Sequence, residues 1–218
     1  MSEWYPIMLK LEGRKCVVVG GGLVAERKTM GLLQAKADVV IVSPQVTSTI
    51  SQWAETGQLT LINREVQSDD LDGAVLLFAA TDRQDINRWI AQLAEERGIL
   101  VNLADAGERG EFLTPAVIRR GGLVLTASAS GAGPALAARI IRELGEQYGP
   151  EYEQSIEVLR KIRTIVQAEV VDPIERRELL QVAASQEALE DWRAELTLPD
   201  QVKLLERLRQ RVQNQKGK

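Results

Sequence analysis

The chain has 218 residues, of which 27% are charged and 44% hydrophobic, with a formal net charge of -4 and an isoelectric point near 5.2. This acidic balance argues against a non-specific binder of nucleic acids or other polyanions. Histidine is absent and Cys16 is the only cysteine, which excludes a disulfide framework and a cysteine-based zinc site, and we predict no metal site.

The first half of the chain alternates apolar runs of strand length with segments of helical periodicity. The apolar runs begin at residues 15, 38, 59, 74 and 98, and the helical segments cover residues 23–36 and 85–97. Continuous β-branched runs bounded by glycine or polar residues are typical of strands buried on both faces of a parallel sheet. We therefore predict an α/β fold, with a Rossmann-type doubly wound parallel sheet over residues 1–112.

The pattern changes after residue 112. A short helix, a strand near residues 123–128, a Ser/Gly loop and a helix opened by Pro134 predict a small α+β unit over residues 113–149. Residues 150–218 are predicted to be all-helical, with new helices starting at Asp172 and at Asp200. No apolar run approaches the roughly 20 residues of a membrane span, and the N-terminus lacks the pattern of a signal peptide. We therefore expect a soluble, cytoplasmic protein with no membrane partner.

A glycine-rich stretch, VVVGGGLVAERK, lies between the first predicted strand and the first predicted helix. Gly20, Gly22 and Ala25 fit the pattern G-x-G-x-x-A of dinucleotide-binding loops. The first glycine permits the tight turn, the second lets the backbone approach a pyrophosphate, and the small third residue lets helix pack on strand. The helix N-terminus then offers free N–H groups and the positive end of its dipole. The pattern predicts a dinucleotide site, although a turn without any ligand has the same letters.

Two further positions fall at the same edge of the predicted sheet. Ser43 ends the second strand, where an Asp or Glu often binds the ribose, so the sequence leaves the choice between NAD and NADP open. Thr81, in the stretch AATD, follows the fourth strand and is a candidate cofactor contact. The alternative for this stretch is helix capping by Asp82 or Asp85.

Four ordered stretches resemble the precorrin-2 dehydrogenase family, which includes the dehydrogenase and ferrochelatase parts of siroheme synthases. They are VVVGGGLVAERKTMGLL, AATDRQDINRWIA, VNLADA and ASASGAGPALAARIIREL, and the likeness covers about residues 1–150. The resemblance implies NAD-dependent oxidation of precorrin-2 to sirohydrochlorin. It also implies, in some members, insertion of ferrous iron to give siroheme, and a homodimer built on the unit at residues 113–149.

The resemblance also implies roles for particular residues. The catalytic carboxylate is Asp105, and the cofactor contacts are Gly20, Gly21, Gly22, Leu23, Val24, Ser43 and Pro44. A substrate-binding loop follows the strand predicted near residues 123–128, with candidates Ser128, Ser130 and Gly131, to which the residues themselves add the nearby Arg139. Ala129 stands where the family usually has a second hydroxyl, which puts any hydrogen bond assigned to that position in doubt.

The residues themselves support this chemistry in part. Asp105 follows an apolar run that could desolvate it and raise its pKa, as a general base requires, but a turn-capping aspartate would look the same. The acetate and propionate groups of the substrate could be bound by arginines, which could equally form a solvated face or dimer salt bridges. The candidates are Arg109, Arg119, Arg120, Arg139 and Arg142.

Two alternatives to a dehydrogenase stay open. The absence of histidine favours dehydrogenation without efficient iron insertion, although carboxylates can bind ferrous iron transiently, so a bifunctional dehydrogenase and chelatase remains an alternative. A dinucleotide-sensing module without chemistry would need the glycine loop but neither Asp105 nor the Ser128 loop.

Overall fold

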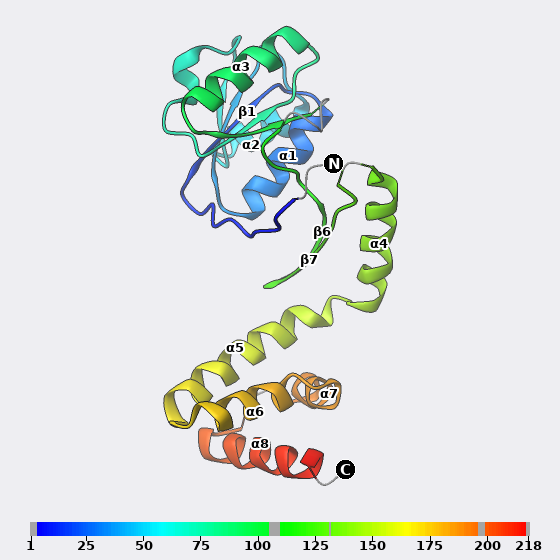
Figure 1. Cartoon of the computed structure of the whole chain (residues 1–218). Helices are drawn as coiled ribbons and strands as arrows, with labels where there is room; N and C mark the ends of the chain where they lie inside the picture. Colours follow the sequence, from blue (N-terminus) through cyan, green and yellow to red (C-terminus); the bar gives the residue numbers. More distant parts are fainter. Residues whose placement is uncertain (1–3, 105–109, 131, 196–198, 217–218) are drawn as a thin grey trace. The chain divides into compact units, whose positions relative to one another are not determined.

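The computed structural model describes residues 4–104, 110–130, 132–195 and 199–216. The chain divides into two compact units (Figure 1). The N-terminal unit comprises Met1–Thr114 and Ser130–Ala132, and the C-terminal unit comprises Pro115–Ala129 and Gly133–Lys218. Of the helices in the described part of the chain, none combines the length and the apolar character needed to cross a membrane.

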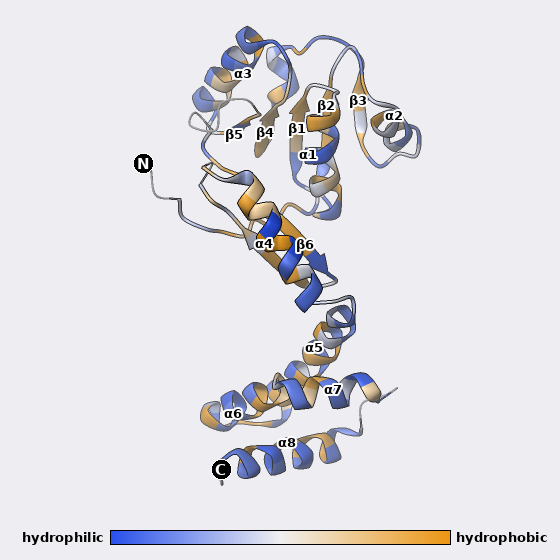
Figure 2. Ribbon diagram, turned by 90° about the vertical axis from the view of Figure 1, so that its right-hand side faces the viewer, coloured by the Kyte–Doolittle hydropathy of each residue, from blue (hydrophilic) through white to orange (hydrophobic). Residues whose placement is uncertain are grey.

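Five parallel strands form the sheet of the N-terminal unit, and Figure 2 shows them side by side in the order β3-β2-β1-β4-β5. In the central strand, Val17 pairs with Val40 on one side and with Leu77 on the other. All five predicted strands are present, so the doubly wound parallel sheet is confirmed. The strands are β1 (Lys15–Val19), β2 (Asp38–Val42), β3 (Thr60–Ile62), β4 (Leu76–Ala79) and β5 (Leu100–Leu103).

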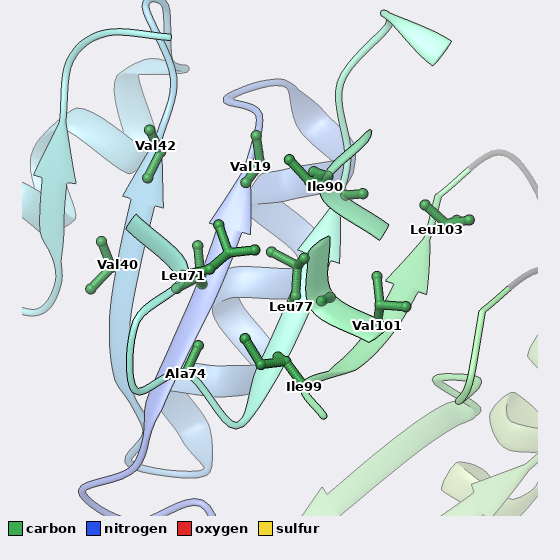
Figure 3. Packing of buried hydrophobic residues seen from close by; sticks show 13 residues of the cluster. Val19, Val40, Val42, Leu71, Ala74, Leu77, Ile90, Ile99, Val101 and Leu103 are labelled. Atoms are coloured by element: carbon green, nitrogen blue, oxygen red, sulfur yellow. The ribbon is translucent and has the colours of Figure 1, made fainter. Parts of the chain in front are cut away.

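Helices cover both faces of this sheet, which is why the strand sequences are apolar throughout. On one face Leu71 and Ile90 pack against Val19 and Leu77 (Figure 3). On the other face Ile50 packs into a second cluster with the alternate residues of the strands. The first face is covered by the 3-10 helix η1 (Ser68–Leu71) and α3 (Gln84–Glu96), and the second by α1 (Leu23–Gln34) and α2 (Ser48–Glu55).

The sequence analysis did not predict helix α2. Thr47 caps this helix, because its hydroxyl oxygen accepts a hydrogen bond from the N–H of Ile50 at 3.3 Å. Ile50 is the only residue of α2 that is fully buried, so the eight-residue helix carries too short an apolar stripe for periodicity to reveal it.

The C-terminal unit begins with an antiparallel hairpin of β6 (Ala116–Arg120) and β7 (Leu123–Ala127). The strand predicted near residues 123–128 is confirmed, but the short helix predicted before it is wrong. Gly121 and Gly122 form a two-residue turn, with Gly121 at a φ of +55°. Two glycines between apolar strands are a typical hairpin signal, because such turns need positive φ.

The described residues from Pro134 onward are mostly helical, as predicted. Pro134 opens α4, Asp172 caps α6 with Pro173 in its first turn, and the last helix starts after Asp200. Ser185 caps a separate helix that the sequence analysis did not distinguish. The helices are α4 (Pro134–Gln147), α5 (Glu151–Glu169), α6 (Pro173–Ala183), α7 (Gln186–Ala194) and α8 (Gln201–Lys216).

Trp192 of α7 lies at the centre of the core that α5 to α8 share, and it is 1% exposed. Its indole N–H donates to the carbonyl oxygen of Ala183 at 3.0 Å, and the Arg207 guanidinium lies 4.6 Å from the ring centroid. The boundary predicted between residues 149 and 150 lies inside this C-terminal unit and stays a prediction.

Candidate functional site

The carboxyl ends of the five parallel strands meet at one edge of the sheet. The chain runs from β1 outward to β3 on one side and then returns to β4 on the other side of β1. In open α/β sheets, ligands bind in the crevice at the point where the strand order reverses. The loops that follow β1 and β4 therefore form the candidate site.

The three glycines after β1 differ in what surrounds them. A Cβ on Gly20, whose φ is +121°, would lie 2.7 Å from the carbonyl carbon of Ala80. A Cβ on Gly21 would lie 2.9 Å from the carbonyl carbon of Gln45, whereas a Cβ on Gly22 would meet nothing within 4 Å. Gly20 and Gly21 are thus required by the close approach of other loops, and Gly22 leaves an open backbone face.

This open face lies at the beginning of α1. Gly22 is the N-cap of the helix, and a glycine has no side chain to satisfy the N–H groups of the first turn. Leu23 and Val24 are 77% and 38% exposed beside it, while Ala25 is fully buried against the sheet. Free N–H groups, the positive end of the helix dipole and an uncovered backbone fit a pyrophosphate.

The loop after β2 is fixed mainly by its own hydrogen bonds. Ser43 is 7% exposed, its hydroxyl donates to the carbonyl oxygen of Gln45 at 2.6 Å, and its N–H donates to Ile62 at 3.1 Å. The Asn63 carboxamide, in the orientation that pairs both of its polar atoms, donates to the carbonyl oxygens of Ser43 and Pro44. Ser43 and Pro44, the predicted ribose contacts, therefore lie in a loop that is held by hydrogen bonds. The hydroxyl proton of Ser43 is already donated to Gln45 within this loop.

Thr47 connects this loop to the glycine loop. Its N–H donates to the carbonyl oxygen of Gly21 at 3.0 Å, and its hydroxyl donates to the Glu26 carboxylate at 2.6 Å. Sequence reasoning missed this residue, because α2, the helix that it caps, carries too short an apolar stripe to be predicted.

Thr81 lies directly after β4, at the predicted edge. Its hydroxyl lies 2.7 Å from the Oδ1 atom of Asn87, and its carbonyl oxygen accepts a hydrogen bond from Asn87 Nδ2 at 2.9 Å. The capping alternative for Asp82 and Asp85 is wrong, because Arg83 is the N-cap of α3 and no side chain caps that helix. Asn87 is a further residue that the sequence analysis missed.

Asp105, the predicted base, lies outside the described residues. The chain on both sides of it is held to the sheet: Ala104 N–H donates to Ala79 at 3.0 Å, and Glu111 N–H donates to Val101 at 2.9 Å. The Glu111 carboxylate accepts a hydrogen bond from the N–H of Val101 at 3.1 Å. This bond pairs a backbone group of β5, the last strand of the sheet. The role predicted for Asp105 stays a prediction.

Lys28 of α1 reaches the last part of the N-terminal unit. Its ammonium group donates a hydrogen bond to the Thr114 hydroxyl and lies 5.5 Å from the centroid of the Phe78 ring. Burial lowers the pKa of the Lys28 ammonium, and the neighbouring charge of Arg27 acts in the same direction. Phe112 meets the Phe78 ring edge-on, so this segment is packed as well as hydrogen-bonded.

The predicted substrate residues lie around the loop between β7 and α4. Ser128 and Ser130 are exposed, and Ser130 has a φ of +50°, which is uncommon for a non-glycine residue. Arg139 forms an ion pair with Glu143 one turn along α4 at 3.5 Å. Gly131 lies outside the described residues, and the substrate roles of all four residues stay predictions.

The arginines near this loop differ in their surroundings. The Arg120 guanidinium donates to the carbonyl oxygens of Tyr148 and Gly145, which gives it a structural role at the end of α4. Arg119 and Arg142 are exposed, and Arg109 lies outside the described residues. Among the described residues, no group of three or more Cys, Asp or Glu side chains is arranged to hold a metal ion.

Comparison with known proteins identifies relatives over most of the chain. A family model described as "Putative NAD(P)-binding" matches residues 7–116. The precorrin-2 dehydrogenase of Priestia megaterium is 35% identical over 176 residues, which is 81% of this chain and 87% of that protein. The siroheme synthase of Photobacterium profundum is 40% identical over 150 residues, but the match covers only 32% of its length.

The fold comparison agrees with the sequence comparison. The structure of SirC, a precorrin-2 dehydrogenase, matches with a TM-score of 0.75 and 31% sequence identity, covering 95% of this chain and 100% of that one. The chain spans about a third of the siroheme synthases that it matches, and most of the shorter dehydrogenase. The chain therefore belongs to the precorrin-2 dehydrogenase and siroheme synthase family.

Proposed function

We propose that this protein is an NAD-dependent precorrin-2 dehydrogenase that produces sirohydrochlorin for siroheme biosynthesis. The observation that carries the proposal is the open backbone face of Gly22 at the start of α1, in a chain that aligns with 87% of a precorrin-2 dehydrogenase. The open backbone at Gly22 fits a dinucleotide, and the similarity to a precorrin-2 dehydrogenase indicates the class of substrate.

The glycine loop would hold the pyrophosphate. Gly20, Gly21 and Gly22 give the backbone its approach, and the exposed Leu23 and Val24 would line the adjoining surface. Ser43 and Pro44 would face the adenosine ribose, and Thr81 would lie nearest to the redox ring. NAD, when bound, supplies the oxidising equivalent by accepting a hydride.

Asp105 would act as the base in this reaction. Conversion of precorrin-2 to sirohydrochlorin removes two hydrogens, one as a hydride and one as a proton, and the carboxylate would receive the proton. Ser128, Ser130, Gly131 and Arg139 would bind carboxylates of the substrate, because hydroxyl, N–H and guanidinium groups donate to carboxylate oxygens.

The experiment is a spectroscopic assay. Precorrin-2 and NAD are incubated with the protein, and the absorbance of sirohydrochlorin and of NADH is followed together. Equal formation of both products is expected, and Asp105→Ala should reduce turnover at least about a hundred-fold, the lower range for loss of a general base. Full turnover by Asp105→Ala would remove this residue from the mechanism, whereas no turnover by the natural chain would overturn the proposed function.

The alternative function is that of a bifunctional enzyme, which would also insert ferrous iron into sirohydrochlorin. The siroheme synthase relatives favour testing it, and their names apply to proteins of which the match covers only 32%. Anaerobic addition of Fe²⁺ to the product mixture decides the question: appearance of the siroheme spectrum at a rate proportional to enzyme concentration would add chelation to the function.

We also propose that the protein is a cytoplasmic homodimer. Apolar side chains on the outside of the β6, β7 and α4 unit support a partner there, since Val117, Leu136 and Ile140 are 44%, 45% and 37% exposed. Analytical ultracentrifugation should give twice the mass of 24.1 kDa, and Ile140→Glu should shift the equilibrium toward the monomer.

A further inference from the structure

The backbone of β4 loses its strand partners at Thr81. Hydrogen bonds between neighbouring strands continue one residue beyond the strands themselves, with Ala80 N–H donating to Val19 at 2.8 Å and Ala104 N–H donating to Ala79 at 3.0 Å. At Thr81 the chain turns away toward α3, and its backbone is held by a side chain instead.

That side chain is the carboxamide of Asn87. Its Oδ1 atom lies 3.3 Å from the backbone nitrogen and 2.7 Å from the hydroxyl of Thr81, and its Nδ2 atom donates to the Thr81 carbonyl oxygen at 2.9 Å. Asn87 is only 2% exposed and lies on the same face of α3 as the buried Ile90 and Ala94. Both the oxygen and the nitrogen of the Asn87 carboxamide therefore bond to Thr81. In these buried surroundings an unsatisfied polar atom would cost free energy.

The peptide group that Asn87 holds also touches the glycine loop. A Cβ on Gly20 would lie 2.7 Å from the carbonyl carbon of Ala80 and 3.2 Å from the backbone nitrogen of Thr81. The Thr81 nitrogen is the same atom that faces Asn87 Oδ1. The peptide between residues 80 and 81 is thus fixed by Asn87 on one side and packed against Gly20 on the other.

We infer that Asn87 is a positioning residue for the dinucleotide. By bonding to both the N–H and the carbonyl oxygen of Thr81, Asn87 fixes the peptides on either side of this residue. The peptide between residues 80 and 81 is the surface against which the Gly20 turn is formed, and it sets the direction in which Gly22 and the start of α1 present their N–H groups. Asn87 does this from the core of α3, without contact to the ligand. The inference rests on the proposed dinucleotide site and deepens it.

The first test compares Asn87→Ala with Asp70→Asn. Asn87→Ala should raise the Kd and the KM for NAD about ten-fold, which corresponds to about 1.4 kcal/mol, while the KM for precorrin-2 changes less than about two-fold. Asp70 is a matched control, because it is also buried in the N-terminal unit, and its carboxylate bonds to Arg64 and to the N–H of Gln67 and not to the loops after β1 and β4. Asp70→Asn should lower the Tm but leave the Kd for NAD unchanged. Equal effects of the two variants on NAD affinity would overturn the inference.

The second test uses Asn87→Asp and pH. A protonated carboxyl group has the shape of the carboxamide and can donate to the Thr81 carbonyl oxygen, whereas the ionised form has no proton to donate there. NAD affinity of this variant should therefore approach that of the natural protein as pH falls below the pKa of the new carboxyl, and should drop at least about five-fold above it. Binding is measured by calorimetric titration at pH values where thermal scans show a folded protein.

The outcomes separate the two claims. If the natural protein binds no pyridine dinucleotide, the proposed function fails, and the inference fails with it. If the natural protein binds NAD but the affinity of Asn87→Asp does not depend on pH relative to the natural protein, only the role of Asn87 is lost. Should Asn87→Ala not fold, the titration of Asn87→Asp alone decides.

Discussion

Gly20 and Gly22 are two residues apart in one loop, but only Gly20 lies where a side chain would clash with its neighbours. Gly20 needs positive φ and room for Ala80, so Gly20→Ala should lower the free energy of unfolding by about 1–3 kcal/mol. Gly22 has a φ of -82° and open space around it, so Gly22→Ala should change stability by less than about 0.5 kcal/mol. The added methyl would nevertheless stand where the pyrophosphate is proposed, and NAD affinity should fall. Urea denaturation and NAD titration of both variants check this, and a destabilised Gly22→Ala would contradict it.

Asp70 illustrates how one buried carboxylate makes stability depend on pH. Its oxygens accept two hydrogen bonds from Arg64, each 2.7 Å long, and this guanidinium lowers the pKa of Asp70 against the opposing effect of burial. A carboxyl whose pKa is lower in the folded state adds stability above its unfolded pKa of about 3.9 and loses that contribution as pH falls through the folded value.

Asp70→Asn should therefore reduce the free energy of unfolding at pH 7 by about 1–3 kcal/mol, and the difference from the natural protein should shrink below pH 4. Urea denaturation between pH 3 and pH 7 measures both quantities. A difference that stays constant across this range would show that ionisation of Asp70 is not the cause.

At the scale of elements, the last three helices of the C-terminal unit, α6, α7 and α8, each begin at a side chain that caps them. Asp172 accepts hydrogen bonds from the N–H groups of Ile174 and Glu175 at the start of α6, at 3.2 and 3.1 Å. Asp172→Ala should cost about 1 kcal/mol of stability, whereas Asp172→Ser should restore most of the loss, because serine is also a good N-cap. Thermal unfolding of the three proteins checks the order, and equal stability of the alanine and serine variants would contradict capping.

At the scale of the whole molecule, the two units have separate cores and should respond to different perturbations. Calorimetry should resolve two unfolding transitions, and NAD at a hundred times its Kd should stabilise only the N-terminal unit, by about 2.7 kcal/mol. Trp192→Ala removes the largest side chain of the C-terminal core. It should lower the free energy of unfolding of the C-terminal unit by about 3–5 kcal/mol. One transition that moves with both changes would show that the two units unfold together.

Most of the fold was predictable because its determinants are local. The strands β1, β2 and β4 are apolar runs with glycine or polar boundaries, and α3 has a clear apolar stripe. The hairpin of β6 and β7 replaces the short helix predicted before the strand near residues 123–128, although Gly121 and Gly122 between two apolar segments are typical of a hairpin turn. Capping of α3 by Asp82 or Asp85 also proved wrong, since the backbone enters that helix at Arg83 without a side-chain cap.

The sequence by itself determined the alternation of strands and helices, the glycine loop after β1 and the likeness to one enzyme family, since each depends on residues close together in the chain. Only the tertiary structure decided that Gly20 packs on Ala80, that the Ser43 hydroxyl turns inward to Gln45, and that Asn87 holds Thr81. These contacts join separate loops or depend on which way a side chain turns, and they follow from how the strands align and how α3 rests on the sheet. In the sequence, a buried asparagine on an apolar helix face only interrupts the run of apolar positions. Its hydrogen bonds to the Thr81 backbone are known only from the tertiary structure.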